Sequence, residues 1–69
     1  MSDENANPAR ILIIDDHPVV RRGLAGLINE ADDLTVCGEA DSLSQGLALL
    51  RELKPALALV DLSLSLIHI

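Results

Sequence analysis

The chain contains no phenylalanine, tryptophan or tyrosine and only one cysteine, Cys37. Without aromatic rings it cannot bind a ligand by aromatic stacking. With one cysteine it cannot form an internal disulfide, which fits a reducing, intracellular compartment. We expect Cys37 to be a small buried apolar residue rather than a redox or metal site.

Long apolar runs are also absent, because no stretch approaches the ~20 residues that span a bilayer. The start, MSDENANPAR, is polar and acidic, unlike a secretory signal peptide. Residues 1–9 are therefore expected to form a disordered leader. These features predict a cytoplasmic protein without membrane contact.

Basic residues are scarce. Eleven aspartates and glutamates against five lysines and arginines give a formal net charge of −6. A surface that binds nucleic acid is basic, so we expect this segment to make no contact with nucleic acid. With 69 residues, the chain holds one small domain at most, and such a domain is marginally stable because it buries only about 60% of its unfolded surface.

Three apolar segments have the composition of strands. Residues 11–14, ILII, form a continuous run rich in β-branched residues, which is typical of a strand buried on both faces. Residues 34–40, LTVCGEA, alternate apolar with small or polar residues, as an edge strand does. The predicted strands cover residues 10–15, 34–40 and 56–62.

Two helices are predicted between these strands. Pro18 suits the first turn of a helix over residues 18–31, and we expect Gly23 and Gly26 to permit close packing on the sheet. Ser42 and Gln45 form a capping box for a second helix, which ends before Pro55. The predicted apolar faces are Val20, Leu24, Leu27, Ile28 and Ala31 in the first helix and Leu43, Leu47, Leu50 and Leu53 in the second.

The order β-α-β-α-β predicts an α/β fold with a parallel sheet and helical crossovers. If the first and third strands are neighbours, the strand order is 2-1-3. Right-handed crossovers then place the two helices on opposite faces of the sheet.

Acidic residues end two of the predicted strands. Asp15 and Asp16 end the first strand, and Asp61 ends the third. Ligands of parallel α/β sheets bind beyond the carboxyl ends of the strands, where the strand order reverses. Three neighbouring carboxylates repel one another, and Mg²⁺ would neutralise them. A carboxylate can also accept a phosphoryl group as a nucleophile. Aspartate after a strand often serves only to turn or cap the chain, but a pair plus a third acid favours a functional site.

Other polar residues near these acids have simpler interpretations. We expect His17 to be an exposed residue at the helix entry rather than a ligand or a general base. Glu39 is expected to be a charge near a turn rather than part of the site. Arg21 and Arg22 either face a partner protein or form a solvated helix face, and the sequence leaves both alternatives open.

The segments ILIIDDHPVVRRGL, VCGEADS and LKPALALVDLSL closely resemble the first half of a response-regulator receiver domain of the NarL/LuxR type. The resemblance implies a flavodoxin-like fold, here truncated, over residues 10–63. It implies that Asp61 is the phosphoacceptor and that a sensor histidine kinase is the phosphodonor. It also implies that Mg²⁺ is bound by Asp15, Asp16, Asp61 and the backbone carbonyl of Ser63. Full-length members of this type bind DNA through a C-terminal helix-turn-helix.

The chain departs from the family pattern in several ways. Ser65 stands where proline is usual, and Ala56 stands where aspartate is frequent. The family's switch hydroxyl and its phosphate-binding lysine fall beyond Ile69, so we expect a signalling module that is not switch-competent. Residues 64–69, LSLIHI, resemble the translation of a transposon-end adapter used in DNA sequencing. We expect this apolar tail not to be native sequence; the alternative is a natural truncation or frameshift.

Two other functions stay open at this point. The chain could be a fragment of another α/β nucleotide-binding or hydrolase domain, although no GxGxxG follows the first strand. Aspartate-nucleophile phosphatases carry a D-x-D on that strand, whereas here the two acids are adjacent. The chain could also be a natural decoy that binds a kinase. Under the receiver interpretation it is not an enzyme.

Overall fold

The computed structural model describes residues 7–62. Ser63, residues 1–6 of the predicted leader and the predicted tail lie outside the described residues. The elements are β1 (Ala9–Asp15), α1 (Pro18–Glu30), β2 (Leu34–Ala40), α2 (Leu43–Leu53) and β3 (Leu57–Asp61). Their order is the predicted one. The ends differ slightly, because β1 begins one residue earlier than predicted and β3 is one residue shorter at each end.

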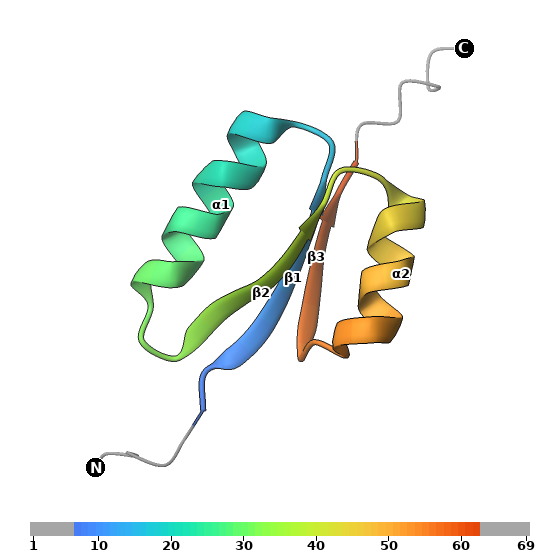
Figure 1. The fold of residues 1–69 in the computed structure, drawn as a ribbon. Helices are drawn as coiled ribbons and strands as arrows, with labels where there is room; N and C mark the ends of the chain where they lie inside the picture. Colours follow the sequence, from blue (N-terminus) through green and yellow to red (C-terminus); the bar gives the residue numbers. More distant parts are fainter. Residues whose placement is uncertain (1–6, 63–69) are drawn as a thin grey trace.

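The three strands form one parallel sheet in the order β2-β1-β3. This confirms the predicted order and places β2 at an edge. It is the order found at the start of a flavodoxin-like sheet. Figure 1 shows α1 and α2 on opposite sides of this sheet. The fold is therefore the predicted α/β arrangement.

The central strand β1 supplies most of the core because helices cover it on both faces. Ile11 and Ile13 pack with Ile28 of α1 on one face. Leu12 and Ile14 pack with Ala40 on the other, where Leu49 of α2 also contacts the cluster. Alternate side chains of a strand point to opposite faces. A continuous apolar run at residues 11–14 is therefore what a doubly covered strand requires.

The predicted apolar faces of the helices are partly wrong. In α1, Leu24 and Ile28 pack on the sheet, but Leu27 is 67% exposed. In α2, Gly46 is buried and Leu49 contacts the core. The physical reason is that α2 has apolar residues around much of its circumference, so periodicity alone cannot select the packed side. The predicted members that lie exposed are Val20 and Leu27 in α1 and Leu43, Leu47 and Leu50 in α2.

The close approaches of helix and sheet occur at glycines other than the predicted pair. A Cβ added at Gly23 or Gly26 would meet nothing within 4 Å, so neither glycine is needed for packing. A Cβ at Gly38 would lie 2.7 Å from Cδ1 of Leu53. A Cβ at Gly46 would lie 2.8 Å from Cγ1 of Ile14. Gly38 follows an irregularity in the β1–β2 register, a position where glycine is common.

The cap of α2 differs in one detail from a capping box. The Ser42 hydroxyl accepts a hydrogen bond from the backbone N–H of Gln45 at 3.2 Å, as predicted. The Gln45 side chain, however, accepts from the backbone N–H of Asp41 rather than from that of Ser42, at 3.1 Å. Both bonds satisfy donors near the helix start. Within the described part of the chain, no helix is long and apolar enough to span a bilayer.

Candidate functional site

The carboxyl ends of β1 and β3 bring the three predicted acids to one edge of the sheet. Parallel pairing of these strands places Asp15 directly opposite Asp61. Asp16 is the residue that follows β1, before the start of α1 at Pro18. Asp15 is fully buried, whereas Asp16 and Asp61 are exposed. The edge therefore combines one buried carboxylate with two that solvent can reach.

The buried carboxylate of Asp15 is incompletely satisfied. Its Oδ1 accepts a hydrogen bond from the backbone N–H of His17 at 2.8 Å. Its Oδ2 is buried and has no hydrogen-bond partner within residues 7–62. Burying a carboxylate without compensating partners costs several kcal/mol. A cation beside Asp15 would remove much of this cost, so the observed environment of the carboxylate fits a metal site.

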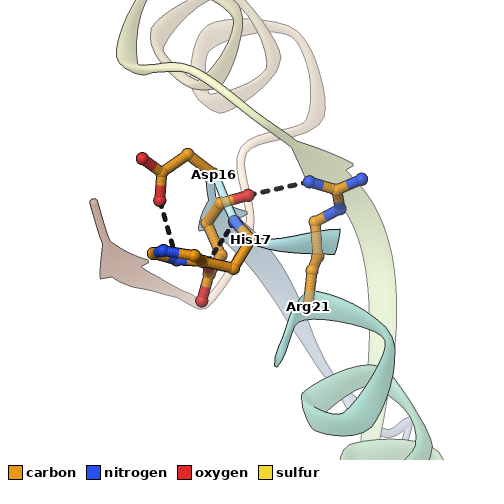
Figure 2. A network of polar contacts seen from close by, with 4 residues as sticks. Asp16, His17 and Arg21 are labelled. Carbon is orange, nitrogen blue, oxygen red and sulfur yellow. Dashed lines mark hydrogen bonds and ion pairs between the residues drawn. The ribbon is translucent and has the colours of Figure 1, made fainter. Parts of the chain in front are cut away.

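The imidazole of His17 lies against both members of the acid pair, as Figure 2 shows for Asp16. Its Nδ1 is 3.0 Å from Oδ1 of Asp16 and 3.3 Å from Oδ1 of Asp15. The side chain is 52% exposed, so the predicted exposure at the helix entry is confirmed. The contact with both acids was not predicted, because it depends on the extended backbone of His17 as the N-cap of α1.

Arg21 contacts both the end of β1 and β2. Its Nη1 donates a hydrogen bond to the backbone carbonyl of Asp15 at 2.8 Å, as Figure 2 shows. Its Nε lies 3.3 Å from Oε1 of Glu39. Arg22, the next residue, is exposed. Arg21 thus makes contacts within the chain that neither alternative predicted, and the exposed Arg22 is compatible with both alternatives.

A cation could be held by Asp15, Asp16 and His17, each of which offers one ligand atom within 4.8 Å of the others. Two carboxylates are a usual protein contribution to a Mg²⁺ site, in which water fills the remaining positions. Asp61 lies opposite Asp15 but is not a member of this group. Its ligand role stays a prediction, and Ser63 lies outside the described residues.

The role of Arg21 can be tested by replacing it with methionine, which keeps the apolar stem and removes the guanidinium. We expect Arg21→Met to lower the free energy of unfolding by about 1–2 kcal/mol, because one charge-assisted hydrogen bond and one partly exposed ion pair are lost. Urea titration followed by circular dichroism measures this. Arg22→Met is the matched control and should change stability by less than about 0.5 kcal/mol. Equal effects of the two substitutions would show that the contacts of Arg21 contribute nothing.

Comparison with known proteins agrees with this geometry. The response regulator receiver domain family matches residues 11–68. The nitrate/nitrite response regulator protein NarL of Escherichia coli K12 is 50% identical over 60 residues, which are 87% of this chain and 28% of NarL. The transcriptional regulatory protein LiaR of Bacillus subtilis is 47% identical over 53 residues, 77% of this chain and 25% of LiaR. The response regulator GacA of Pseudomonas viridiflava is 42% identical over 55 residues, 80% of this chain and 26% of GacA.

The chain thus spans about a quarter of the length of these relatives. The resemblance found in the sequence is confirmed, and the family match leaves no support for another nucleotide-binding or hydrolase domain. Receiver domains bind Mg²⁺ at an acidic site, and the described residues include a cluster, Asp15, Asp16 and His17, that could hold a metal ion. By its sequence, its strand order and the acids at the sheet edge, the chain belongs to the response regulator receiver domain family of two-component signalling.

Proposed function

We propose that this chain is a phosphoacceptor module of a two-component phosphorelay in the cytoplasm, and not an enzyme with a turnover of its own. In this proposal Asp61 takes a phosphoryl group from the phosphohistidine of a sensor histidine kinase. The observation that carries the proposal is the pairing of Asp15 with Asp61 on neighbouring parallel strands. This pairing supports the proposal, because Asp61 is exposed and belongs to the same sheet edge as the cluster that could hold a cation.

The transfer needs few groups from the protein. An oxygen of the Asp61 carboxylate forms a bond to phosphorus while the bond between phosphorus and the kinase imidazole nitrogen breaks. The imidazole leaves with the electron pair of that bond and takes up a proton, and Asp61 becomes an acyl phosphate. The exposure of Asp61 supports this role, because the attacking oxygen must be reached by the histidine of another protein.

Asp15 and Asp16 would hold Mg²⁺ beside the acceptor, together with Asp61 and the backbone carbonyl of Ser63. A bound Mg²⁺ neutralises negative charge on the transferring phosphoryl group. Asp15 is suited to this role because its carboxylate is buried and one of its oxygens lacks a hydrogen bond within the described residues. Arg21 holds the backbone of Asp15 by the bond to its carbonyl, which keeps the end of β1 in place.

The proposal covers acceptance of the phosphoryl group and not the conformational switch. We further propose that the whole protein is a transcription regulator that contacts DNA outside this segment. The name of LiaR, a transcriptional regulatory protein, supports this. The net charge of −6 supports a segment that does not itself bind DNA.

Phosphorylation of Asp61 can be tested on the purified chain with acetyl phosphate and Mg²⁺. Borohydride reduction traps an acyl phosphate as homoserine, which peptide mass spectrometry locates even at low occupancy. We expect homoserine at position 61, none when Mg²⁺ is chelated, and none in Asp61→Asn. Asp41→Asn is the matched control, because Asp41 is an exposed aspartate just beyond the carboxyl end of β2. This variant should be labelled at Asp61 like the unchanged chain.

Labelling at another acid, or labelling that persists in Asp61→Asn, would contradict the assignment of the acceptor. Binding of a histidine kinase with no transfer to Asp61 would instead favour a decoy.

A further inference from the structure

The ring nitrogen of His17 occupies a position that a metal ligand would occupy. Two atoms bound at right angles to a cation at about 2.1 Å lie about 3.0 Å apart. The distances from Nδ1 of His17 to the two carboxylate oxygens are 3.0 Å for Asp16 and 3.3 Å for Asp15. Two distances of the group are therefore close to the separation of neighbouring ligands of one ion, and Asp15, Asp16 and His17 each offer a ligand atom within 4.8 Å of the others.

A second observation, the burial of the Asp15 carboxylate, favours a cation at this place. The Asp15 side chain is fully buried, and its Oδ2 has no hydrogen-bond partner in the described part of the chain. A buried carboxylate in this state is costly unless a cation compensates it. The backbone N–H of His17 donates to only one of the two oxygens of Asp15, Oδ1, and so leaves this cost in place.

The backbone places His17 beside the acids, and the contacts of its Nδ1 with both carboxylates orient the ring. His17 is the N-cap of α1 with an extended conformation, φ −107° and ψ 109°, and Pro18 follows it in the first turn. The bond from its N–H to Oδ1 of Asp15, at 2.8 Å, closes the short loop between strand and helix. A cation would therefore meet a ring that is already oriented, at a small cost in side-chain entropy.

We propose that Nδ1 of His17 is a ligand of the divalent cation bound by Asp15 and Asp16, so that a nitrogen is added to the oxygen ligands of the proposed site. Imidazole suits transition-metal ions, whereas Mg²⁺ prefers oxygen. The site should therefore accept Mn²⁺ and similar ions through His17 and bind Mg²⁺ through the carboxylates. This inference rests on the proposed cation site and deepens it by naming the class of ion.

Mn²⁺ tests the proposal, because electron spin echo spectra of bound Mn²⁺ show modulation from a coordinated ¹⁴N. The chain has two histidines, His17 and His68, so the experiment uses the His68→Gln chain. We expect ¹⁴N modulation from bound Mn²⁺, its replacement by a ¹⁵N pattern when histidine is ¹⁵N-labelled, and its loss in His17→Gln. The isotope exchange needs no change at the site, so it stays informative if His17→Gln fails to fold.

Calorimetric titration supplies the second readout. We expect His17→Gln to weaken Mn²⁺ binding by at least the roughly tenfold that loss of an outer-shell partner costs, and to leave Mg²⁺ affinity within about twofold. Bound Mn²⁺ without histidine ¹⁴N modulation, in a chain where Asp15→Asn abolishes binding, would overturn the role of His17 and leave the proposed function intact. Mn²⁺ binding that Asp15→Asn does not change would overturn the proposed cation site itself.

Discussion

Asp15→Asn should stabilise the cation-free chain and abolish its response to Mg²⁺. The substitution keeps the size and shape of a fully buried side chain, and its amide oxygen can still accept the hydrogen bond from the backbone N–H of His17. It removes a buried negative charge whose Oδ2 has no hydrogen-bond partner within residues 7–62. We expect the free energy of unfolding without cation to rise by about 1–2 kcal/mol, because a buried charge is removed, although the amide NH2 that replaces Oδ2 stays without a partner.

The same substitution should remove the stabilisation by Mg²⁺. An ion that binds only the folded state at 100 times its Kd stabilises that state by about 2.7 kcal/mol. This increment should appear in urea titrations of the unchanged chain with Mg²⁺ and be absent for Asp15→Asn. The unchanged chain should therefore be the less stable one without Mg²⁺ and the more stable one with saturating Mg²⁺.

Asp16→Asn is the matched control for the effect of burial. Asp16 is exposed and its side chain is 34% accessible, so its charge is solvated in the absence of an ion. We expect this variant to change cation-free stability by less than about 0.5 kcal/mol, yet to weaken Mg²⁺ binding. If Asp15→Asn destabilised the cation-free chain, the idea that the Asp15 carboxylate is held at a cost would be wrong.

The sequence predicts the sheet and its acidic edge well because both follow from strong local signals. The run at residues 11–14 can be buried on both sides only in a central strand. Once that strand is central, the order 2-1-3 places Asp15 beside Asp61, and the structure has this pairing. No knowledge of side-chain conformation is needed for these steps.

The sequence does not predict contacts that depend on the geometry of a loop. The roles of His17 and Arg21 arise from the turn between β1 and α1, which directs the imidazole to two carboxylates and the guanidinium to a backbone carbonyl. In the sequence, both residues are compatible with a solvated helix start. The sequence spacing contains one signal for Arg21. It lies four residues after His17, and its backbone N–H donates to the carbonyl of His17, so Arg21 lies in the first turns of the helix, close to the end of β1.

The packed side of α2 also escapes sequence analysis, because a small residue decides it. Gly46 is buried against Ile14, and α2 can approach the sheet closely where no Cβ intervenes. Larger apolar residues on the same helix, such as Leu43 and Leu47, stay exposed. The hydrophobicity of a side chain indicates the free energy gained when it is buried, but not how closely the helix backbone can approach the sheet. The effect on stability of replacing a glycine in a helix therefore depends on the element packed against that glycine.

Gly46→Ala should destabilise the chain, whereas Gly26→Ala should stabilise it. Both replacements favour the helix by up to about 1 kcal/mol, since alanine has a higher helix propensity than glycine. At Gly26 a Cβ meets nothing within 4 Å, so this gain is kept. At Gly46 the Cβ would lie 2.8 Å from Cγ1 and 3.1 Å from Cγ2 of Ile14. Overpacking of this kind costs about 1–3 kcal/mol, which exceeds the gain in propensity.

The clash at Gly46 is not easily relieved, because Cγ1 and Cγ2 are attached directly to the Cβ of Ile14 on the central strand and move only by rotation about χ1, which is restricted in a β-branched residue. Cδ1 of Ile14, which also lies close to the added Cβ, is the flexible part. Ile14→Val removes it and alone should cost about 0.5–1.5 kcal/mol. In the Gly46→Ala background it should cost less or even stabilise, and urea titrations of the four chains measure this coupling. Additive effects would mean that α2 moves away from the sheet, and the tight contact of Gly46 with β1 would then not determine which side of α2 is packed.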